Sequence, residues 1–523
     1  MASNNIGITS ATYNDVTRTN IEVLSKDISA QIAKAKFISI DTEFTGLVLS
    51  NASRVFGLNT AEWVTRAVNM REKYKAMANI AKTHALVSMG LSTFSIRHTR
   101  PGSYNVHNFN FLLQAQNSHL INPTSISFLA ENGFDLGRQA TKGIRYFSGP
   151  NPQPVEVKTP AINKEGRLIR EVFFDIVRAG VPLVIHNGLF DLVYLYQSFF
   201  GPLPDTYESF VFDLSEMFPG GIYDTKIIAE NEAPGTATYL AYMYHKCERA
   251  QKLRMERGEP ALALRLKDSL LHGSSEPKVR CLQLLSDTRS PKPYCEQFAL
   301  HGHCRYGKRC FRSHDVNFIL DCQEKEAAAA EEELGVEADE ASADNSAGDK
   351  KRKRDDTMDV DASASDPPSK AVKTDTGNGV QQAVATTAMA DCLPVDKQTD
   401  SASAPLALPP PAEESKEANG SDSLVVPDEP PLNMYHTAAY DAFMTGYIFA
   451  SFRLVLDDKM SNYKNKVYLT GGSESPLLIK AGPYANTSVT YRQTMRLMNT
   501  AAAEPSAPAA DQQQQQPKDA APA

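Results

Sequence analysis

The sequence predicts a mixed α/β fold, and three observations lead to that prediction. The segment 36–41 is a short apolar run that is typical of a strand. The segment 62–81 carries apolar residues at spacings of three and four, which indicates a helix packed on a sheet. The run 181–185 is apolar at every position, as in a strand covered on both faces. Alternating strands and helices of this kind build a layered α/β domain.

The elements between these segments fit the same plan. We expect strands at 86–94 and 104–113, and a short helix at 126–132 that Gly133 ends. A better helix, 167–178, is closed by Gly180 at the position where a left-handed cap is common. A further strand leads into Asp224 and Thr225, which we interpret as helix caps and not as ligands. After the segment 435–441, a strongly apolar helix is expected that contains Ala442, Phe443, Met444, Ile448 and Phe449.

Two carboxylates, Asp41 and Glu43, end the first strand with one residue between them. Side chains on a strand alternate between its faces, so both acids are expected to project from the same face. Two like charges held this close are unfavourable unless a cation lies between them. The pattern is also common at strand ends and helix caps, so a structural role stays open for this pair taken alone.

The strand 181–185 runs directly into His186, Asn187 and Gly188, and a helical pattern follows. Asn187 is expected to cap that helix, which places Asp191 in or near its first turn, at the carboxyl edge of the sheet. From there Asp191 could reach the end of a neighbouring strand. The alternative is an acid that only complements the helix dipole, beside a packed His186.

His436 and Asp441 begin the next ordered segment after a long polar stretch. Five residues correspond to about 140° around an ideal helix, so both can face one site only if His436 lies before or at the helix start. Pro430 and Pro431 discourage a helix upstream and allow this. The alternative for His436 is a core or capping residue.

A metal site is predicted by Cys295, Cys304, Cys310 and His314, whose spacing is C-x8-C-x5-C-x3-H. Three thiolates and one imidazole complete a tetrahedral Zn²⁺ shell with no open position, so the site is expected to be structural. A segment this short would not fold without the metal. The other cysteines have no ligand-like spacing, and we interpret them as ordinary thiols: Cys247, Cys281, Cys322 and Cys392.

Cations alternate with aromatic residues around these ligands, in Arg305, Tyr306, Lys308, Arg309 and Phe311. Such a mixture suits the phosphates and stacked bases of single-stranded RNA. The alternative is a finger that mediates only protein contacts.

The composition divides the chain of 523 residues, whose net charge is −8, into folded and polar parts. The segment 323–427 is poor in aromatic residues and is expected to be disordered. We therefore expect a folded domain at 20–290 and 428–498, the finger at 291–318, the insert at 323–427 and a tail at 499–523. A basic cluster in the insert favours a nuclear localisation signal over a solvated charge run; it consists of Lys350, Lys351, Arg352, Lys353 and Arg354. No apolar run is long enough for a membrane span and no signal sequence is evident, so we expect a soluble intracellular protein.

Five residues match, in order, the three exonuclease motifs of DEDD-type nucleases of the histidine subclass: Asp41, Glu43, Asp191, His436 and Asp441. The sequence segments around them are similar to those of the poly(A)-specific ribonuclease and CAF-type deadenylase family; these segments are 41–47, 186–191 and 223–226. The resemblance covers about 20–318 and 430–490. A C-C-C-H finger between the second and third motifs, followed by a basic signal, is similar to a nuclear branch of that family.

The resemblance implies a ribonuclease-H-like mixed sheet flanked by helices. It implies a 3′→5′ exoribonuclease, or deadenylase, that shortens the 3′ tails of RNA and releases 5′-nucleotides. For the nuclear branch it implies small nuclear RNAs as substrates, nuclear protein partners, and residence in the nucleoplasm, Cajal bodies or nucleolus. The alternatives are an RNA-binding adaptor with an inactive nuclease fold and a DNA 3′ exonuclease.

The resemblance also assigns roles to single residues. The four acids would hold two Mg²⁺ ions, with Mn²⁺ as the alternative, about 4 Å apart, and such ions activate a water and stabilise the departing oxygen. His436 would take the proton of the attacking water. Phe44 and Leu47 would either stack on the terminal bases or pack under the sheet edge.

Overall fold

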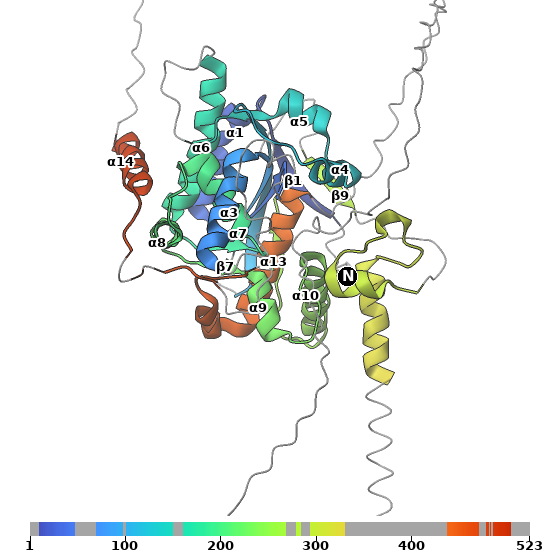
Figure 1. Ribbon diagram of the computed structural model, residues 1–523. Coiled ribbons are helices and arrows are strands. Elements are labelled where there is room, and N and C mark those ends of the chain that lie inside the picture. The colour runs from blue at the N-terminus through green and yellow to red at the C-terminus, as the bar shows by residue number, and fades with distance from the viewer. Residues whose placement is uncertain are drawn as a thin grey trace, which may run out of the picture.

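A mixed sheet runs through the centre of the computed structural model, which describes residues 10–47, 69–97, 101–149, 160–267, 279–283, 293–329, 437–469, 477–480, 482 and 485–503 (Figure 1). Its strands lie in the order β11-β10-β7-β6-β2-β3-β4-β1-β9, and β5 and β8 also pair with β4. The strands are β1 (Ser10–Val16), β2 (Phe37–Phe44), β3 (Leu86–Ile96), β4 (Ser103–Ala115), β5 (Ile144–Tyr146), β6 (Leu183–Ile185), β7 (Ile222–Asp224), β8 (Ala263–Leu266), β9 (Val279–Gln283), β10 (Lys466–Val467) and β11 (Leu477–Leu478).

The central five strands confirm the predicted fold class. In the run β4-β3-β2-β6-β7, β3 is antiparallel to both β2 and β4, whereas β6 is parallel to β2 and β7 is parallel to β6. This mixture of three antiparallel strands followed by parallel ones is the arrangement expected of a ribonuclease-H-like sheet.

Helices cover both faces of the sheet. They are α1 (Ile21–Lys34), α3 (Met70–Thr83), α4 (Pro123–Glu131), α5 (Leu136–Lys142), α6 (Pro160–Ala179), α7 (Leu189–Leu195), the π-helix η2 (Tyr196–Phe200), α8 (Tyr207–Met217), α9 (Thr225–Glu232), α10 (Leu240–Glu256), α11 (Glu296–His301), the 3₁₀ turns η3 (Gly307–Arg309) and η4 (Asp457–Tyr463), α13 (Ala438–Leu456) and α14 (Val489–Ala503). A further helix spans 316–329.

The alternation of side chains along β2 divides the interior into two cores. Ile38 and Ile40 pack in the core that contains α1, α3 and α6, whereas Phe37 packs in the core that contains α10 and α13. Phe37 stacks there on Phe94, with ring centroids 4.5 Å apart. The helix α13 lies beside β2 and β3, although it follows them far along the chain (Figure 1).

The predicted apolar helix that contains Phe443 and Phe449 is confirmed as α13. All its residues from Ala438 to Ser451 are buried, because one side rests on the sheet and another on α10. A helix that is apolar on all sides can be stable only when it is enclosed in this way. The acid at its first turn, Asp441, is therefore held by a rigid element.

Several predicted boundaries need correction. The strand at 181–185 begins at Leu183, the helix at 126–132 begins at Pro123 after the cap Asn122, and the helix at 167–178 extends from 160 to 179. Of the helix expected at 62–81, the described part begins at Met70. Gly133 and Gly180 take left-handed φ values of 89° and 61°, as their positions at helix ends suggested.

The prediction that Asn187 caps α7 is wrong. The cap position is occupied by Gly188, which makes no side-chain cap bond, while Asn187 has a left-handed φ of 55°. The reason lies in the next strand, because the backbone N–H of Asn187 donates to the carboxylate of Asp224 at 2.8 Å.

Among the helices described, none is long and apolar enough to cross a bilayer.

Candidate functional site

Three carboxylates from two distant segments meet at the end of β2. Asp41, Glu43 and Asp441 each offer an oxygen within 4.8 Å of the other two. Asp41 and Glu43 project from one face of the strand, and Asp441 lies in the first turn of α13, where the helix dipole favours a negative charge. The structure thus brings together the first and third predicted motifs.

Burial and mutual repulsion raise the proton affinity of this cluster. The pKa of Asp41 is raised well above its ordinary value by burial, and then by the charges of Asp441, Asp191 and Glu43. The pKa of Glu43 is raised by burial and then by Asp441 and Asp191. Because hard divalent cations seek oxygen ligands, the donor set fits Mg²⁺ or Mn²⁺, which would relieve the repulsion.

Asp191 is adjacent to this cluster and is not one of the three acids within 4.8 Å of one another. Thr42, which stands between the two acids of β2, donates from Oγ1 to Oδ1 of Asp191 at 2.5 Å. Burial raises the pKa of Asp191 to about 6, and the bond from Thr42 opposes that rise. Thr42 was not singled out in the sequence, because a threonine in a strand carries no signal until its partner is known.

The residues around Asp224 support the edge of the sheet. Asp224 is fully buried and accepts hydrogen bonds from the backbone N–H groups of Asn187, Lys226 and Tyr468. Burial raises the pKa of Asp224 to about 6. The bond from Lys226 caps α9, as predicted. Thr225 has a different role, because its hydroxyl donates to the carbonyl of Ile185.

His186 is packed and neutral. Its Nδ1 lies 2.8 Å from Oγ1 of Thr225, and burial, followed by the charge of Lys226, lowers the pKa of His186 to about 3. These contacts agree with the packing alternative for His186. His436, which was predicted to complete the site, lies outside the described residues, directly before the cap residue Thr437 of α13.

Phe44 and Leu47 pack against the core beside the site. The Phe44 ring stacks on Tyr194 with centroids 4.3 Å apart, and Leu47 is partly buried. The Tyr194 hydroxyl also donates to the carbonyl of Gly46 at 2.6 Å, which fixes the turn that follows the acids. One face of Phe44 is therefore used in packing, and base stacking by these two residues stays a prediction.

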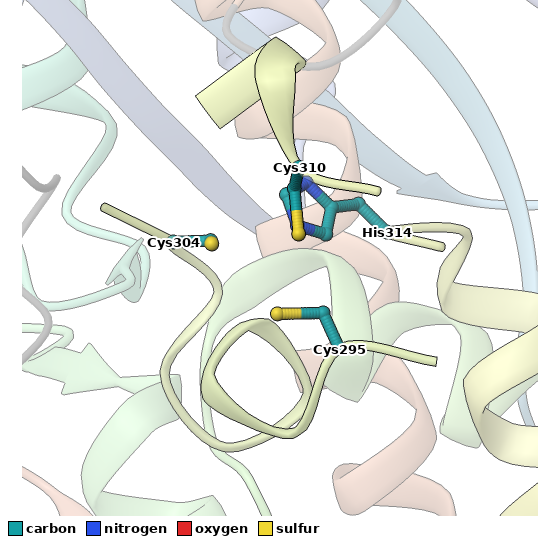
Figure 2. Close-up of side chains that lie close together, drawn as sticks. All are labelled: Cys295, Cys304, Cys310 and His314. Carbon is teal, nitrogen blue, oxygen red and sulfur yellow. The ribbon is translucent and has the colours of Figure 1, made fainter. Parts of the chain in front are cut away.

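The predicted zinc ligands converge as a second cluster (Figure 2). Cys295, Cys304, Cys310 and His314 each offer an atom within 4.8 Å of the others. Backbone hydrogen bonds between 293–295 and Ser313 hold the first and last ligands near each other. The set has four ligands and no open position, so it fits a structural Zn²⁺.

The environment of His314 suits a metal ligand. Nε2 of His314 is buried without a hydrogen-bond partner among the described residues. Its ring stacks on Phe298 at 4.4 Å with an angle of 7°, and burial lowers the pKa of His314. A neutral imidazole with a buried, unbonded nitrogen is suited to a metal, because no other group satisfies that nitrogen. His301 and His303 are half-buried.

The finger is docked on the nuclease-like domain through α10. Tyr239, the residue before α10, contacts the Phe298 ring edge to face at 5.9 Å, and a Cβ at Gly302 would lie 2.7 Å from the Tyr239 ring. The helix 316–329 extends this contact, since the Tyr242 hydroxyl donates to Gln323 at 2.8 Å. Residues 323–329 are thus helical, although the insert was predicted to begin at 323.

The outer surface of the finger exposes aromatic and basic groups. Phe311 is 70% exposed and Tyr306 is 50% exposed. The Arg305 guanidinium lies 4.7 Å from the centroid of the Tyr306 ring, and Arg309 is also exposed. Lys308 lies in η3, but its side chain is outside the described part of the structure, as are all five residues of the basic cluster at 350–354.

A family profile and several relatives match parts of this chain. The profile described as CAF1 family ribonuclease matches residues 16–167 and 153–449. The poly(A)-specific ribonuclease PNLDC1 of Homo sapiens is 41% identical over 61 residues, which are 12% of this chain and 12% of that protein. The poly(A)-specific ribonuclease PARN of Danio rerio is 28% identical over 144 residues, which are 26% of this chain and 20% of that protein.

A pre-piRNA 3′-exonuclease trimmer of Bombyx mori is 44% identical over 48 residues, which are 9% of each chain. The matched segments thus span a fifth or less of these relatives' lengths. Among solved structures, S. pombe Pop2p in its Mg²⁺- and Mn²⁺-bound form is 19% identical, with a TM-score of 0.33 over 45% of this chain and 82% of that one.

Proposed function

Since the chain belongs to the CAF1 family of ribonucleases, we propose that it is a divalent-metal-dependent 3′→5′ exoribonuclease that shortens the 3′ tails of RNA, adenosine tails among them. The meeting of Asp41, Glu43 and Asp441 carries this proposal. Asp41 and Glu43 are far from Asp441 in the sequence. Holding three carboxylates this close together is unfavourable unless a metal ion lies between them.

Different residues of the chain would have different roles in phosphodiester hydrolysis. Two Mg²⁺ or Mn²⁺ ions, when bound, would supply Lewis acidity for the attacking water and the departing 3′ oxygen. Asp41, Glu43 and Asp441 would hold these ions, and Asp191, oriented by Thr42, would complete the ligand set. His436 comes directly before the cap residue Thr437 of α13 in the sequence, and we assign it the proton of the attacking water.

The experiment that tests this function uses a 5′-labelled RNA with a 3′ adenosine tail and the full chain. We expect stepwise shortening with Mg²⁺, release of 5′-AMP, and no reaction in EDTA. Binding without shortening would identify an RNA-binding adaptor, and equal shortening of the matched DNA would identify a DNA exonuclease. Tails of adenosine, uridine and cytidine, compared in one assay, would measure the base preference.

Replacing Thr42 should change the pH dependence of this reaction. The hydroxyl of Thr42 lowers the pKa of Asp191, so in Thr42→Val the carboxyl would stay protonated to a higher pH. We expect the acidic limb of the kcat/KM profile to move up by about one pH unit, the worth of one hydrogen bond to a charged group.

The matched control for this prediction is Thr42→Ser, which keeps the hydroxyl and should keep the wild-type limb. Profiles recorded at Mg²⁺ concentrations well below saturation, where protonation of Asp191 competes with metal binding, would separate the two variants. If the acidic limb of the Thr42→Val profile coincided with that of Thr42→Ser, the role of Thr42 would be contradicted.

The finger is assigned to RNA binding. The exposed rings of Tyr306 and Phe311, together with Arg305 and Arg309, provide stacking surfaces and positive charge for single-stranded RNA. We further propose nuclear residence, in the nucleoplasm, Cajal bodies or nucleolus, with small nuclear RNAs as substrates and nuclear proteins as partners. The basic cluster at 350–354 supports import, and imaging of the chain with these five residues changed to alanine would test it.

A further inference from the structure

The first turn of α13 rests directly on the backbone of β3. Gly90 is the residue of β3 that pairs with Asp41 across the β2–β3 ladder. A Cβ placed on Gly90 would lie 1.8 Å from the carbonyl oxygen of Ala438 and 2.6 Å from the backbone nitrogen of Ala439. Both are backbone atoms, which cannot turn away as a flexible side chain can. Only glycine therefore fits at this position while the helix keeps its place.

Two further residues of α13, Ala442 and Gly446, lie equally close to the sheet. The Ser39 hydroxyl, fully buried, donates to the carbonyl of Ala442 at 2.6 Å. A Cβ on Gly446 would lie 2.2 Å from the Phe94 ring. Ala438, Ala442 and Gly446 are spaced by four residues and thus form one stripe on α13. The helix lies as close to the sheet as backbone contact allows.

The height of α13 above the sheet decides where Asp441 lies. Asp441 follows Ala438 by less than one turn, and the partner of Gly90 in the ladder is Asp41 itself. A displacement of the helix start away from the sheet therefore increases the distance between Asp441 and the two acids of β2. A misplacement of about 1 Å in such a site can lower a rate by two orders of magnitude.

We propose that Gly90 is the positioning residue of the site: by lacking a side chain it sets the separation of Asp441 from Asp41 and Glu43. The proposal rests on the proposed function only in that these acids hold the metal. It concerns the geometry of the cluster, so it is decided by metal binding and not by RNA cleavage.

The test compares Gly90→Ala with a glycine of equal steric demand elsewhere. A Cβ on Gly220 would lie 2.3 Å from the backbone carbon of Val181, in the turn before β7. Because β7, β6 and β2 are parallel, this turn lies at the opposite end of the strands from the acids that end β2. We expect both variants to melt at lower temperature than the wild type. Calorimetry with Mn²⁺ on the full chain, well below both melting temperatures, should give at least about a tenfold weaker Kd for Gly90→Ala. Gly220→Ala should bind as the wild type does.

A second variant covers the case in which Gly90→Ala does not fold. Ser39→Ala removes the anchor to Ala442 and adds no atom, and it should weaken Mn²⁺ binding by about fivefold, which corresponds to one hydrogen bond. Wild-type Mn²⁺ affinity in the folded Gly90→Ala variant, or losses equal to those of Gly220→Ala, would overturn the proposal. A chain that binds Mn²⁺ but leaves RNA intact would refute the proposed function. The Mn²⁺ affinities of the Gly90 and Ser39 variants would still decide this inference.

Discussion

Replacing Asp41 by asparagine should lower the rate of RNA shortening by about three orders of magnitude, since loss of one metal ligand removes several kcal/mol of transition-state stabilisation. Asp441→Asn should have a comparable effect, because its carboxylate meets that of Asp41 within the same cluster. Single-turnover shortening of a tailed RNA at saturating Mg²⁺ measures the loss.

The same substitution should stabilise the metal-free protein. The pKa of Asp41 is raised in the folded state above its ordinary value of 3.8, first by burial and then by its acidic neighbours. The folded state therefore binds a proton that the unfolded state has released, and metal-free stability falls as pH rises above about 4. Asparagine has no charge to lose, so Asp41→Asn should melt above the wild type at neutral pH, and the difference should vanish near pH 4.

A buried carboxylate outside the site provides the control. Asp213 is fully buried and accepts hydrogen bonds from the Tyr196 hydroxyl and the backbone of Ser488. Asp213→Asn should keep its RNA-shortening rate below its melting temperature, and Mg²⁺ should still raise that melting temperature. If Asp41→Asn shortened RNA at the wild-type rate, the assignment of the cluster would be wrong.

The parts of the site that were predictable are those written as local patterns. Asp41 and Glu43 share a face because strand side chains alternate, and the four residues of the finger that meet are those selected by the C-x8-C-x5-C-x3-H spacing. The return of Asp441 was predictable only through the family resemblance, since no local pattern links it to β2.

The parts that could not be predicted depend on which backbones touch. The need for glycine at 90 arises from the register of β2 with β3 and from a helix that follows them far along the chain. The role of Thr42 likewise depends on a partner from another element, Asp191. Asn187 was misread because its backbone N–H donates to Asp224, which ends a neighbouring strand and which the local capping pattern does not reveal.

The docked finger was also unpredictable, and it explains why its helix continues past the expected boundary. Tyr242 and Arg249 of α10 hold Gln323 and Glu324 by a hydrogen bond and an ion pair. Composition suggested disorder from 323 onward because these polar residues bury little of their own surface. Their contacts are made with a partner surface instead, which composition does not record.

Removing one zinc ligand should give the second large effect. Cys295 is buried at the start of α11, and its thiol belongs to the four groups that we propose as zinc ligands. Cys295→Ser should therefore reduce bound zinc from one per chain to well below one and unfold the finger. The surfaces of Tyr306 and Phe311 would be lost with it, so RNA affinity should fall by about tenfold or more, as for loss of one or two stacked bases.

The matched control is Cys322→Ser, a half-buried cysteine of the helix 316–329 that is not in the ligand cluster. It should keep both the zinc and the RNA affinity. Zinc content by elemental analysis, and binding of a tailed RNA in Ca²⁺ to prevent cleavage, would separate the two variants. Because the acids of β2 and α13 are not part of the finger, kcat at saturating RNA should stay within about twofold in Cys295→Ser, since only binding free energy is removed. Unchanged RNA affinity after loss of zinc would instead assign the finger to protein contacts, and a collapse of kcat would mean that its docking on α10 supports α13 and with it Asp441.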